Sequence, residues 1–374
     1  MVRPSSTSTK RAVASKSVIR PHAEQKFAEE LAAVRKNDNY PKPENWLTSP
    51  KMTKLYLLGG VAPNGMEITP KYFGDPRIIE RSIATLATDR ALLLTGLPGT
   101  GKSRVSEHLA AAISGDSTLL IQGTAGTDES ELRYDWNYAQ LIANGPSREA
   151  LVKSPMAIGM GDGKIVRVEE LTRVGSEVQD ALITILSEKT LPIPKLNDEI
   201  QAKPGFNVIA TANNRDRGVN ELSSALSRRF NMVILPTPAT IEEEFKIVRF
   251  RVIQMGLALG YPVEKPADKE LMRVATIFRE LRAGATLDGK MKLKSPSGTL
   301  SVAEEISVVN SGLANAGYFG SGSLTAADLA TSLVGAIVKD PGVDAVVWRE
   351  YRQTVMKDRE GWEDLYKACK DIDE

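Results

Sequence analysis

A glycine-rich segment constrains the fold of this chain more than any other feature. It lies between the apolar run at residues 91–95 and a helical pattern that begins at Lys102, and it fits G-x-x-x-x-G-K-[ST]. Glycines allow the backbone to curl so that successive N–H groups point at phosphate oxygens, and the following helix presents the positive end of its dipole to them. The sequence therefore predicts a strand, a phosphate loop at residues 96–103 and a helix, in that order.

The side chains of this loop have distinct predicted roles. Lys102 reaches the β- and γ-phosphates, and the Ser103 hydroxyl is a ligand for Mg²⁺, which takes oxygen ligands from protein and nucleotide together. The predicted nucleotide-binding residues are Gly96, Pro98, Gly99, Thr100, Gly101, Lys102, Ser103 and Arg104. Bound nucleotide and Mg²⁺ are the cofactors that this pattern implies.

Two acidic residues follow the apolar run at residues 165–168. Hydrolysis needs a group that activates water, usually an acid at the end of a strand next to the phosphate loop. Glu170 is the candidate base for the attacking water, and Glu169 is the candidate for holding the metal, directly or through a water. Two carboxylates on a solvated strand end are the alternative. Arg167 interrupts this otherwise apolar run, and the sequence offers no reason for it beyond proximity to the strand end or to a subunit boundary.

Amide and guanidinium groups follow further along the chain. The strand predicted at residues 208–210 leads to Asn213, whose amide could bond the attacking water or the γ-phosphate, although an Asn-rich turn has the same pattern. The short helix predicted within residues 222–230 ends at Arg228 and Arg229. Because the guanidinium group is a planar fork, either arginine suits a γ-phosphate.

The predicted elements alternate between helix and strand over residues 75–236, which favours a parallel α/β sheet. Five strands are expected, at residues 91–95, 118–122, 165–168, 208–210 and 232–235. The whole chain divides into a disordered basic tail (1–21), an N-terminal helix and linker with a small strand pair (22–74), the α/β core (75–240), a helical lid (241–340) and a C-terminal amphipathic helix (341–374). In the N-terminal part, apolar spacing predicts one helix at residues 21–36, and short apolar pieces at 55–58 and 66–68 predict the strand pair. The tail also has some transit-peptide character.

Composition excludes several kinds of site. Lys and Arg number 48 against 47 Asp and Glu, so no overall positive field attracts nucleic acid. One cysteine and two histidines cannot form an intramolecular disulfide or the usual zinc site. No apolar run is long enough to span a membrane. We therefore expect a cytoplasmic protein, in which any nucleic-acid binding would need a local basic patch.

Four motifs together resemble the AAA+ ATPases, within them the MoxR and dynein-related branch, over residues 75–338. They are GLPGTGKS at 96–103, VEELTRVGSEVQDALITILSE at 168–188, ATANNRD at 210–216 and LSSALSRRF at 222–230. The resemblance implies an AAA+ P-loop αβα sandwich with a small all-α lid, ATP as the nucleotide and a homo-oligomeric ring of six subunits. It makes Glu170 the catalytic glutamate, Asn213 the sensor-1 residue, and Arg229, with Arg228 as a second candidate, the finger that reaches into the neighbouring subunit. A hairpin at residues 191–205 is expected before sensor 1.

Two departures from the family pattern concern turnover. Glu169 occupies the Walker B position that is normally aspartate, so slow hydrolysis is expected. The lid stretch at residues 294–300 lacks the usual sensor-2 arginine, and Lys292, Lys294 and Arg282 remain alternatives.

The resemblance implies a ring-shaped ATPase that remodels a protein client, as MoxR-type chaperones do with partners that carry a von Willebrand A domain. A nucleotide-gated assembly scaffold with little turnover and an NTP-driven subunit of a nucleic-acid-processing or restriction complex are the alternatives. Tyr134, Trp136 and Tyr138 alternate, so on an extended segment they would share one face that contacts a client. Core packing of the three rings is the other interpretation.

Overall fold

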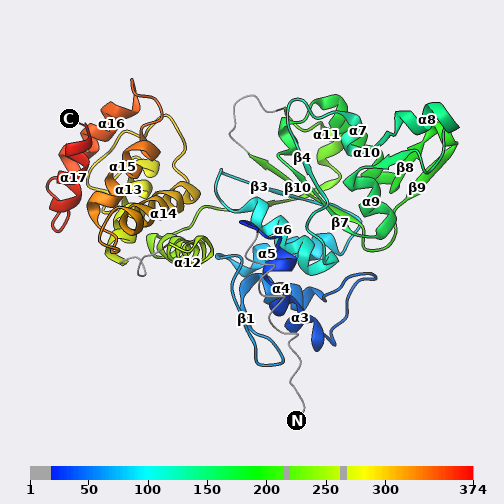
Figure 1. The fold of residues 1–374 in the computed structure, drawn as a ribbon, viewed down its shortest axis with the longest axis horizontal. Helices are drawn as coiled ribbons and strands as arrows, with labels where there is room; N and C mark the ends of the chain where they lie inside the picture. The colour runs from blue at the N-terminus through cyan, green and yellow to red at the C-terminus, as the bar shows by residue number, and fades with distance from the viewer. Residues whose placement is uncertain (1–17, 214–219, 262–267, 374) are drawn as a thin grey trace, which may run out of the picture. The chain divides into compact units, whose positions relative to one another are not determined.

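The computed structural model describes residues 18–213, 220–261 and 268–373, so most of the predicted tail and residues 214–216 of the ATANNRD motif lie outside the described residues. The chain divides into two compact units, of which the first ends at Pro236 and the second begins at Thr237. Residues 98–100 of the phosphate loop group with the second unit. Each unit is drawn in Figure 1 and has its own core.

A parallel sheet forms the centre of the first unit. Its strands are β3 (Ala91–Gly96), β4 (Leu120–Gln122), β7 (Ile165–Glu169), β10 (Asn207–Asn213) and β11 (Phe230–Ile234). Among the described residues, the strand order is β11-β3-β10-β7-β4, and every pairing is parallel. The five-stranded parallel sheet expected from the alternating pattern is therefore confirmed.

Helices cover both faces of this sheet (Figure 1). Successive strand side chains point to opposite faces, so Leu92 and Leu94 lie in one core cluster and Leu93 lies in another. The first cluster includes residues of α5 (Pro76–Leu86) and α6 (Lys102–Ser114), and the second includes residues of α9 (Pro155–Asp162) and α10 (Ser176–Glu188). Burial on both faces explains why the strands are almost wholly apolar. The unit is an αβα sandwich.

The N-terminal segment packs on the same core as α6. It consists of α2 (Ala23–Lys26), α3 (Ala28–Lys36), α4 (Pro50–Leu58), β1 (Gly60–Val61) and β2 (Glu67–Ile68). The single helix expected at residues 21–36 is interrupted at Phe27, whose φ and ψ are −114° and 30°. The expected strand pair is present, but residues 55–58 are helical, because the Ser49 side chain caps α4 and Pro50 occupies its first turn.

Two β-hairpins project from the sandwich. One pairs β5 (Tyr134–Trp136) with β6 (Leu151–Lys153), with α7 (Glu129–Leu132) before it and α8 (Tyr138–Asn144) between its strands. The other pairs β8 (Thr190–Ile193) with β9 (Asp198–Gln201) and confirms the hairpin expected before β10.

The three alternating aromatic residues do not share one face. Trp136 is buried with Ala150 and Ile193, and Tyr134 packs against this cluster, with its ring centroid 5.9 Å from that of Trp136. Tyr138 begins α8 and is 63% exposed, because the change from strand to helix turns its side chain away. Core packing therefore holds for Trp136 and Tyr134, and Tyr138 is on the surface.

Replacing Trp136 with alanine is expected to lower the free energy of unfolding by about 3–5 kcal/mol, because it removes a large buried ring and leaves a cavity. Tyr138→Ala is the matched control and is expected to change it by less than about 0.5 kcal/mol, because that ring is exposed. Urea unfolding of both variants measures the difference. Equal stability of the two variants would show that Trp136 does not support the core.

The second unit is helical among its described residues. Its helices are α12 (Ile241–Leu259), α13 (Asp268–Ala283), α14 (Val302–Tyr318), α15 (Ala326–Ile337), α16 (Asp344–Tyr351), a π-helical turn (Arg352–Met356) and α17 (Glu363–Asp373). Trp348 and Leu365 from the C-terminal helices lie in the same core cluster as Phe278 of α13. The C-terminal segment thus completes the core of this unit. Across both units, none of the helices that the structure describes has the length and apolar character needed to cross a membrane.

Candidate functional site

The phosphate loop has the backbone that its glycines predict. Gly99 and Gly101 have φ values of 78° and 85°, which disfavour residues with a side chain. Gly101 is the N-cap of α6, so no side chain caps this helix, and its first turn carries no acidic residue. The N-terminus of α6 therefore presents a partial positive charge to whatever occupies the loop.

Lys102 and Ser103 are the first two residues of α6, and the first is buried whereas the second is exposed. Lys102 is 6% exposed, and its Nζ donates to the carbonyl oxygens of Gly96 at 3.1 Å and Leu97 at 2.9 Å. Ser103 is exposed, and its Oγ donates to Glu169 Oε2 at 2.7 Å. The hydroxyl oxygen of Ser103 retains acceptor capacity, as a metal ligand requires.

The other predicted loop residues are described by their strand register, their burial and their contacts with the backbone. Gly96 ends β3 in register with Asn213 of β10, whereas Pro98 and Thr100 are half-buried. The Nε of Arg104 donates to the carbonyl oxygen of Lys71 at 3.3 Å, so this side chain contacts the N-terminal segment.

Glu169 lies at the end of β7 and is 3% exposed. Its Oε2 accepts hydrogen bonds from Ser103 and from Thr211 Oγ1 at 2.7 Å, and its Oε1 accepts from Ser106 Oγ and from the Arg167 guanidinium at 2.9 Å. Burial acts to raise the pKa of Glu169, but the Ser106 hydrogen bond, the Arg167 charge and the other two hydroxyls outweigh it and lower the pKa. Glu169 is therefore a buried carboxylate, and not one half of a solvated strand end.

Glu170 and Asn213 are brought together by adjacent strands. The Nδ2 of Asn213 lies 3.0 Å from both carboxylate oxygens of Glu170. Glu170 has φ 57° and ψ 44°, a left-handed conformation that costs a non-glycine residue about 1–3 kcal/mol and is found most often at functional sites. Its N–H donates to Thr211 Oγ1 at 3.1 Å, which helps to hold this conformation.

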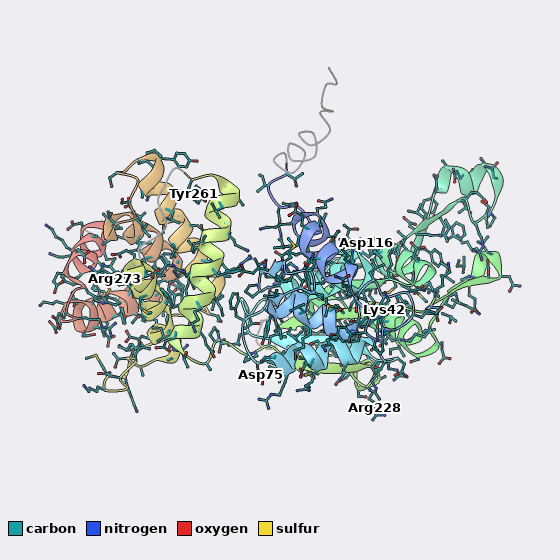
Figure 2. All side chains as sticks on the ribbon, turned by 90° about the horizontal axis from the view of Figure 1, so that it is seen from below. Lys42, Asp75, Asp116, Arg228, Tyr261 and Arg273 are labelled. Atoms are coloured by element: carbon teal, nitrogen blue, oxygen red, sulfur yellow. The ribbon has the colours of Figure 1, made fainter. Side chains whose placement is uncertain are left out.

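Arg228 and Arg229 follow α11 (Ser224–Ser227) and precede β11. Arg229 donates from Nε to Ser187 Oγ at 2.8 Å and from its terminal nitrogen to the carbonyl oxygen of Ala225 at 2.6 Å. Arg228 is exposed, and Figure 2 shows it at the surface of the first unit. Arg229 is thus anchored within this chain through two of its five N–H donors, and Arg228 extends into solvent.

The oxygen groups near Ser103 suit Mg²⁺ better than a transition metal. Over residues 18–213, 220–261 and 268–373, no cluster of three or more His, Cys, Asp or Glu side chains could hold a metal ion. Mg²⁺ does not need such a cage, because it keeps several waters and binds through one or two protein groups together with nucleotide phosphates. The Ser103 hydroxyl, backed by the Glu169 carboxylate, fits that requirement.

Three residues of the site were not found from the sequence. Ser106 and Thr211 both donate hydrogen bonds to Glu169. Ser106 lies one helical turn after Ser103, so the two serines share a face of α6, and Thr211 lies two residues before Asn213, so these two share a face of β10. These spacings could have indicated both residues if Glu169 had been known to face α6. Gly123 follows β4, and a Cβ there would lie 2.5 Å from the carbonyl oxygen of Glu170. The site therefore needs glycine at this position.

Two of the three sensor-2 alternatives are engaged inside the second unit. Arg282 donates to Glu244 and, at 3.1 Å, to the carbonyl oxygen of Leu300, and Lys294 pairs with Glu350 at 2.8 Å. Lys292 is exposed.

Comparisons with known proteins match two consecutive domains of this chain. Residues 91–230 match the AAA domain of the dynein-related subfamily, and residues 242–372 match the YehL-like AAA+ ATPase C-terminal domain. YehL of Escherichia coli K12 is 41% identical over 354 residues, which cover 93% of this chain and 96% of YehL. YojN of Bacillus subtilis 168 is 26% identical over 163 residues, which cover 43% of this chain and 53% of YojN.

Among solved structures, NtrX of Brucella abortus in complex with ADP aligns with a TM-score of 0.46 at 16% identity. The alignment covers 80% of this chain and 65% of NtrX, which is less than two thirds of that protein. The family assignment depends on the two matched domains and on the YehL relationship. This chain belongs to the AAA+ ATPases, with a dynein-related AAA domain followed by a YehL-like C-terminal domain.

Proposed function

We propose that this chain binds ATP with Mg²⁺ at the N-terminus of α6 and hydrolyses it to ADP and phosphate. The observation that carries the proposal is the pairing of Glu170 with Asn213 at the same sheet edge as the phosphate loop. A loop alone would bind phosphate, whereas an acid and an amide on the two strands beside it can also activate water.

Each proposed step has a residue that performs it. Lys102 and the α6 N-terminus bind the phosphates, and Ser103 would hold Mg²⁺, which would supply positive charge to the phosphates when bound. Asn213 orients the attacking water, and Glu170 accepts its proton while the water oxygen bonds to the γ-phosphorus. The bond from the γ-phosphorus to the bridging oxygen breaks, and that oxygen leaves with ADP.

We infer further that the active form is a homo-oligomeric ring of six subunits, in which Arg229 of one subunit stabilises the transition state in its neighbour. Its anchoring to Ser187 and Ala225 supports this role, because a fixed fork loses less conformational freedom when it binds phosphate. Arg228 is the second candidate for the finger.

The proposed output is remodelling of a protein client in the cytoplasm by a MoxR-like machine, with a partner that carries a von Willebrand A domain. Exposed apolar side chains support a protein contact at the hairpin formed by β5 and β6, where Tyr138 and Ile142 of α8 are 63% and 85% exposed. A nucleotide-gated scaffold with little turnover is the alternative. Single-turnover measurements separate the two, because bound ATP that persists for hours in assembled rings would favour the scaffold.

Replacing Lys102 with alanine is expected to abolish detectable ATP binding, because the ammonium inside the loop supplies the charge that holds the β- and γ-phosphates. Titration with a fluorescent ATP analogue measures this, and native mass spectrometry of the same sample shows whether the variant folds and assembles. Lys51→Ala, which removes an exposed lysine of α4, is the control and should bind like wild type. Unchanged affinity of Lys102→Ala would contradict the proposed phosphate site.

A further inference from the structure

Arg167 is a charged residue in the middle of the buried sheet. It lies on β7, two residues before Glu169, and its side chain is 7% exposed. Because alternate residues of a strand face the same side, Arg167 and Glu169 both point towards α6, whereas Val166 and Val168 pack in the core on the other face. An unpaired charge would not be tolerated there, so the contacts of Arg167 indicate its role.

The Arg167 guanidinium joins three parts of the site. Its Nε donates to Ser106 Oγ at 3.0 Å, and one terminal nitrogen donates to the carbonyl oxygen of Ser117 at 3.0 Å. The other terminal nitrogen donates to the carbonyl oxygen of Ser103 at 3.2 Å and to Glu169 at 2.9 Å. One side chain thus connects the metal-binding serine, the helix that carries it and the Walker B acid.

Glu169 has little capacity left for a metal ion. A carboxylate has about four acceptor positions, and Arg167, Ser106, Ser103 and Thr211 together provide four donors. Direct coordination of Mg²⁺ would require one of these donors to leave. The arrangement therefore favours an indirect role, in which Glu169 acts on the metal through the Ser103 hydroxyl.

We propose that Arg167 is a positioning residue for the Mg²⁺ site, and that its guanidinium fork holds Glu169 against Ser103 and the first turn of α6. This inference depends on the proposed binding of a Mg²⁺-nucleotide at that site. Glutamate has one more rotatable bond than aspartate, so its carboxylate needs an additional contact to stay in one place. Arg167 provides this contact and accounts for the presence of arginine in a buried strand.

The experiment is a titration with a fluorescent ADP analogue, in Mg²⁺ and in EDTA, on the full chain. The ratio of the two dissociation constants gives the contribution of Mg²⁺ to binding. Arg167→Met is expected to reduce that contribution by about 10–100-fold, as for other residues that orient metal ligands, with a smaller change in EDTA. Arg167→Lys keeps the positive charge but not the planar fork, so its Mg²⁺ contribution to binding should lie between the values of Arg167→Met and wild type.

Arg273→Met is the matched control. Arg273 is also buried and pairs with Glu270 and Asp364, but it lies among the helices of the second unit (Figure 2). This variant should lower the melting temperature, as we also expect for Arg167→Met, and leave the Mg²⁺ contribution at the wild-type value. Such a result would separate a loss of stability from a loss of positioning.

The outcomes distinguish this inference from the proposed function. If Arg167→Met keeps the wild-type Mg²⁺ contribution, the positioning role of Arg167 is overturned, whereas the proposed ATP binding is not. If that variant does not fold, Arg167→Lys carries the test, and a full Mg²⁺ contribution in it would overturn the requirement for the fork. Failure of the wild-type chain to bind the analogue in Mg²⁺ would instead contradict the proposed function.

Discussion

Replacing Arg229 with alanine is expected to lower ATP turnover of the assembled protein by about 10³–10⁵-fold, while ATP still binds. An arginine supplied by the neighbouring subunit stabilises charge that develops on the γ-phosphate only in the transition state, so its loss affects turnover far more than affinity. The measurement is steady-state ATPase with native mass spectrometry on the same samples, because a variant that fails to assemble would also lose activity.

Arg228→Ala is the matched comparison, because it removes the adjacent arginine, which is exposed. If Arg229 is the finger, the Arg228 variant should keep most of its turnover. A large loss in Arg228→Ala with normal turnover in Arg229→Ala would transfer the role to Arg228. Normal turnover in both assembled variants would show that neither arginine is the finger. For the wild type, the same assay should show specific activity that rises with protein concentration, because each site is completed by a neighbour.

Glu170→Gln is expected to lower turnover by about 10²–10⁴-fold and to leave ATP bound, because an amide cannot accept the proton of the attacking water. The change is nearly isosteric, so the contact with Asn213 can persist through the amide oxygen. Single-turnover chemical quench measures the hydrolytic step, and filter binding measures the ATP retained.

The control for this change is Glu177→Gln, which makes the same substitution at an exposed position of α10. Turnover of the control should match that of wild type. Equal single-turnover rates for wild type and Glu170→Gln would show that Glu170 is not the base. Loss of ATP binding in Glu170→Gln would instead indicate that the carboxylate supports the bound nucleotide.

The sheet and the phosphate loop could be predicted because their physical requirements are local. The loop needs glycine where φ is positive, as at Gly99 and Gly101, and the strand before it needs apolar residues on both faces. Consecutive short strands with helices between them require parallel pairing, which places Glu170 and Asn213 at the same edge. The strand order, which makes β7 and β10 neighbours and so brings these two residues into contact, was not predicted.

The features that could not be predicted depend on contacts between distant segments. The presence of Arg167 could not be explained locally, because three of its four partners, Ser103, Ser106 and Ser117, lie 50–64 residues earlier in the chain. The break at Phe27 lies where packing against the α6 core outweighs local periodicity. The α4 helix is an exception, because the cap at Ser49 and Pro50 is a local signal that the sequence analysis missed. The alternate spacing of Tyr134, Trp136 and Tyr138 predicts one shared face only if the whole segment is extended. The strand ends at Trp136 and a helix begins at Tyr138, so the prediction was wrong for Tyr138.

In the proposed site, a triphosphate binds at the N-terminus of α6, and the Glu170 carboxylate is directed at the water that attacks it. A structure of the assembled protein with a non-hydrolysable ATP analogue tests this most directly. We expect γ-phosphate oxygens within hydrogen-bonding distance of Lys102 Nζ, and a water between the γ-phosphorus and Glu170. An analogue bound elsewhere, or a Glu170 carboxylate turned away from the γ-phosphorus, would contradict it.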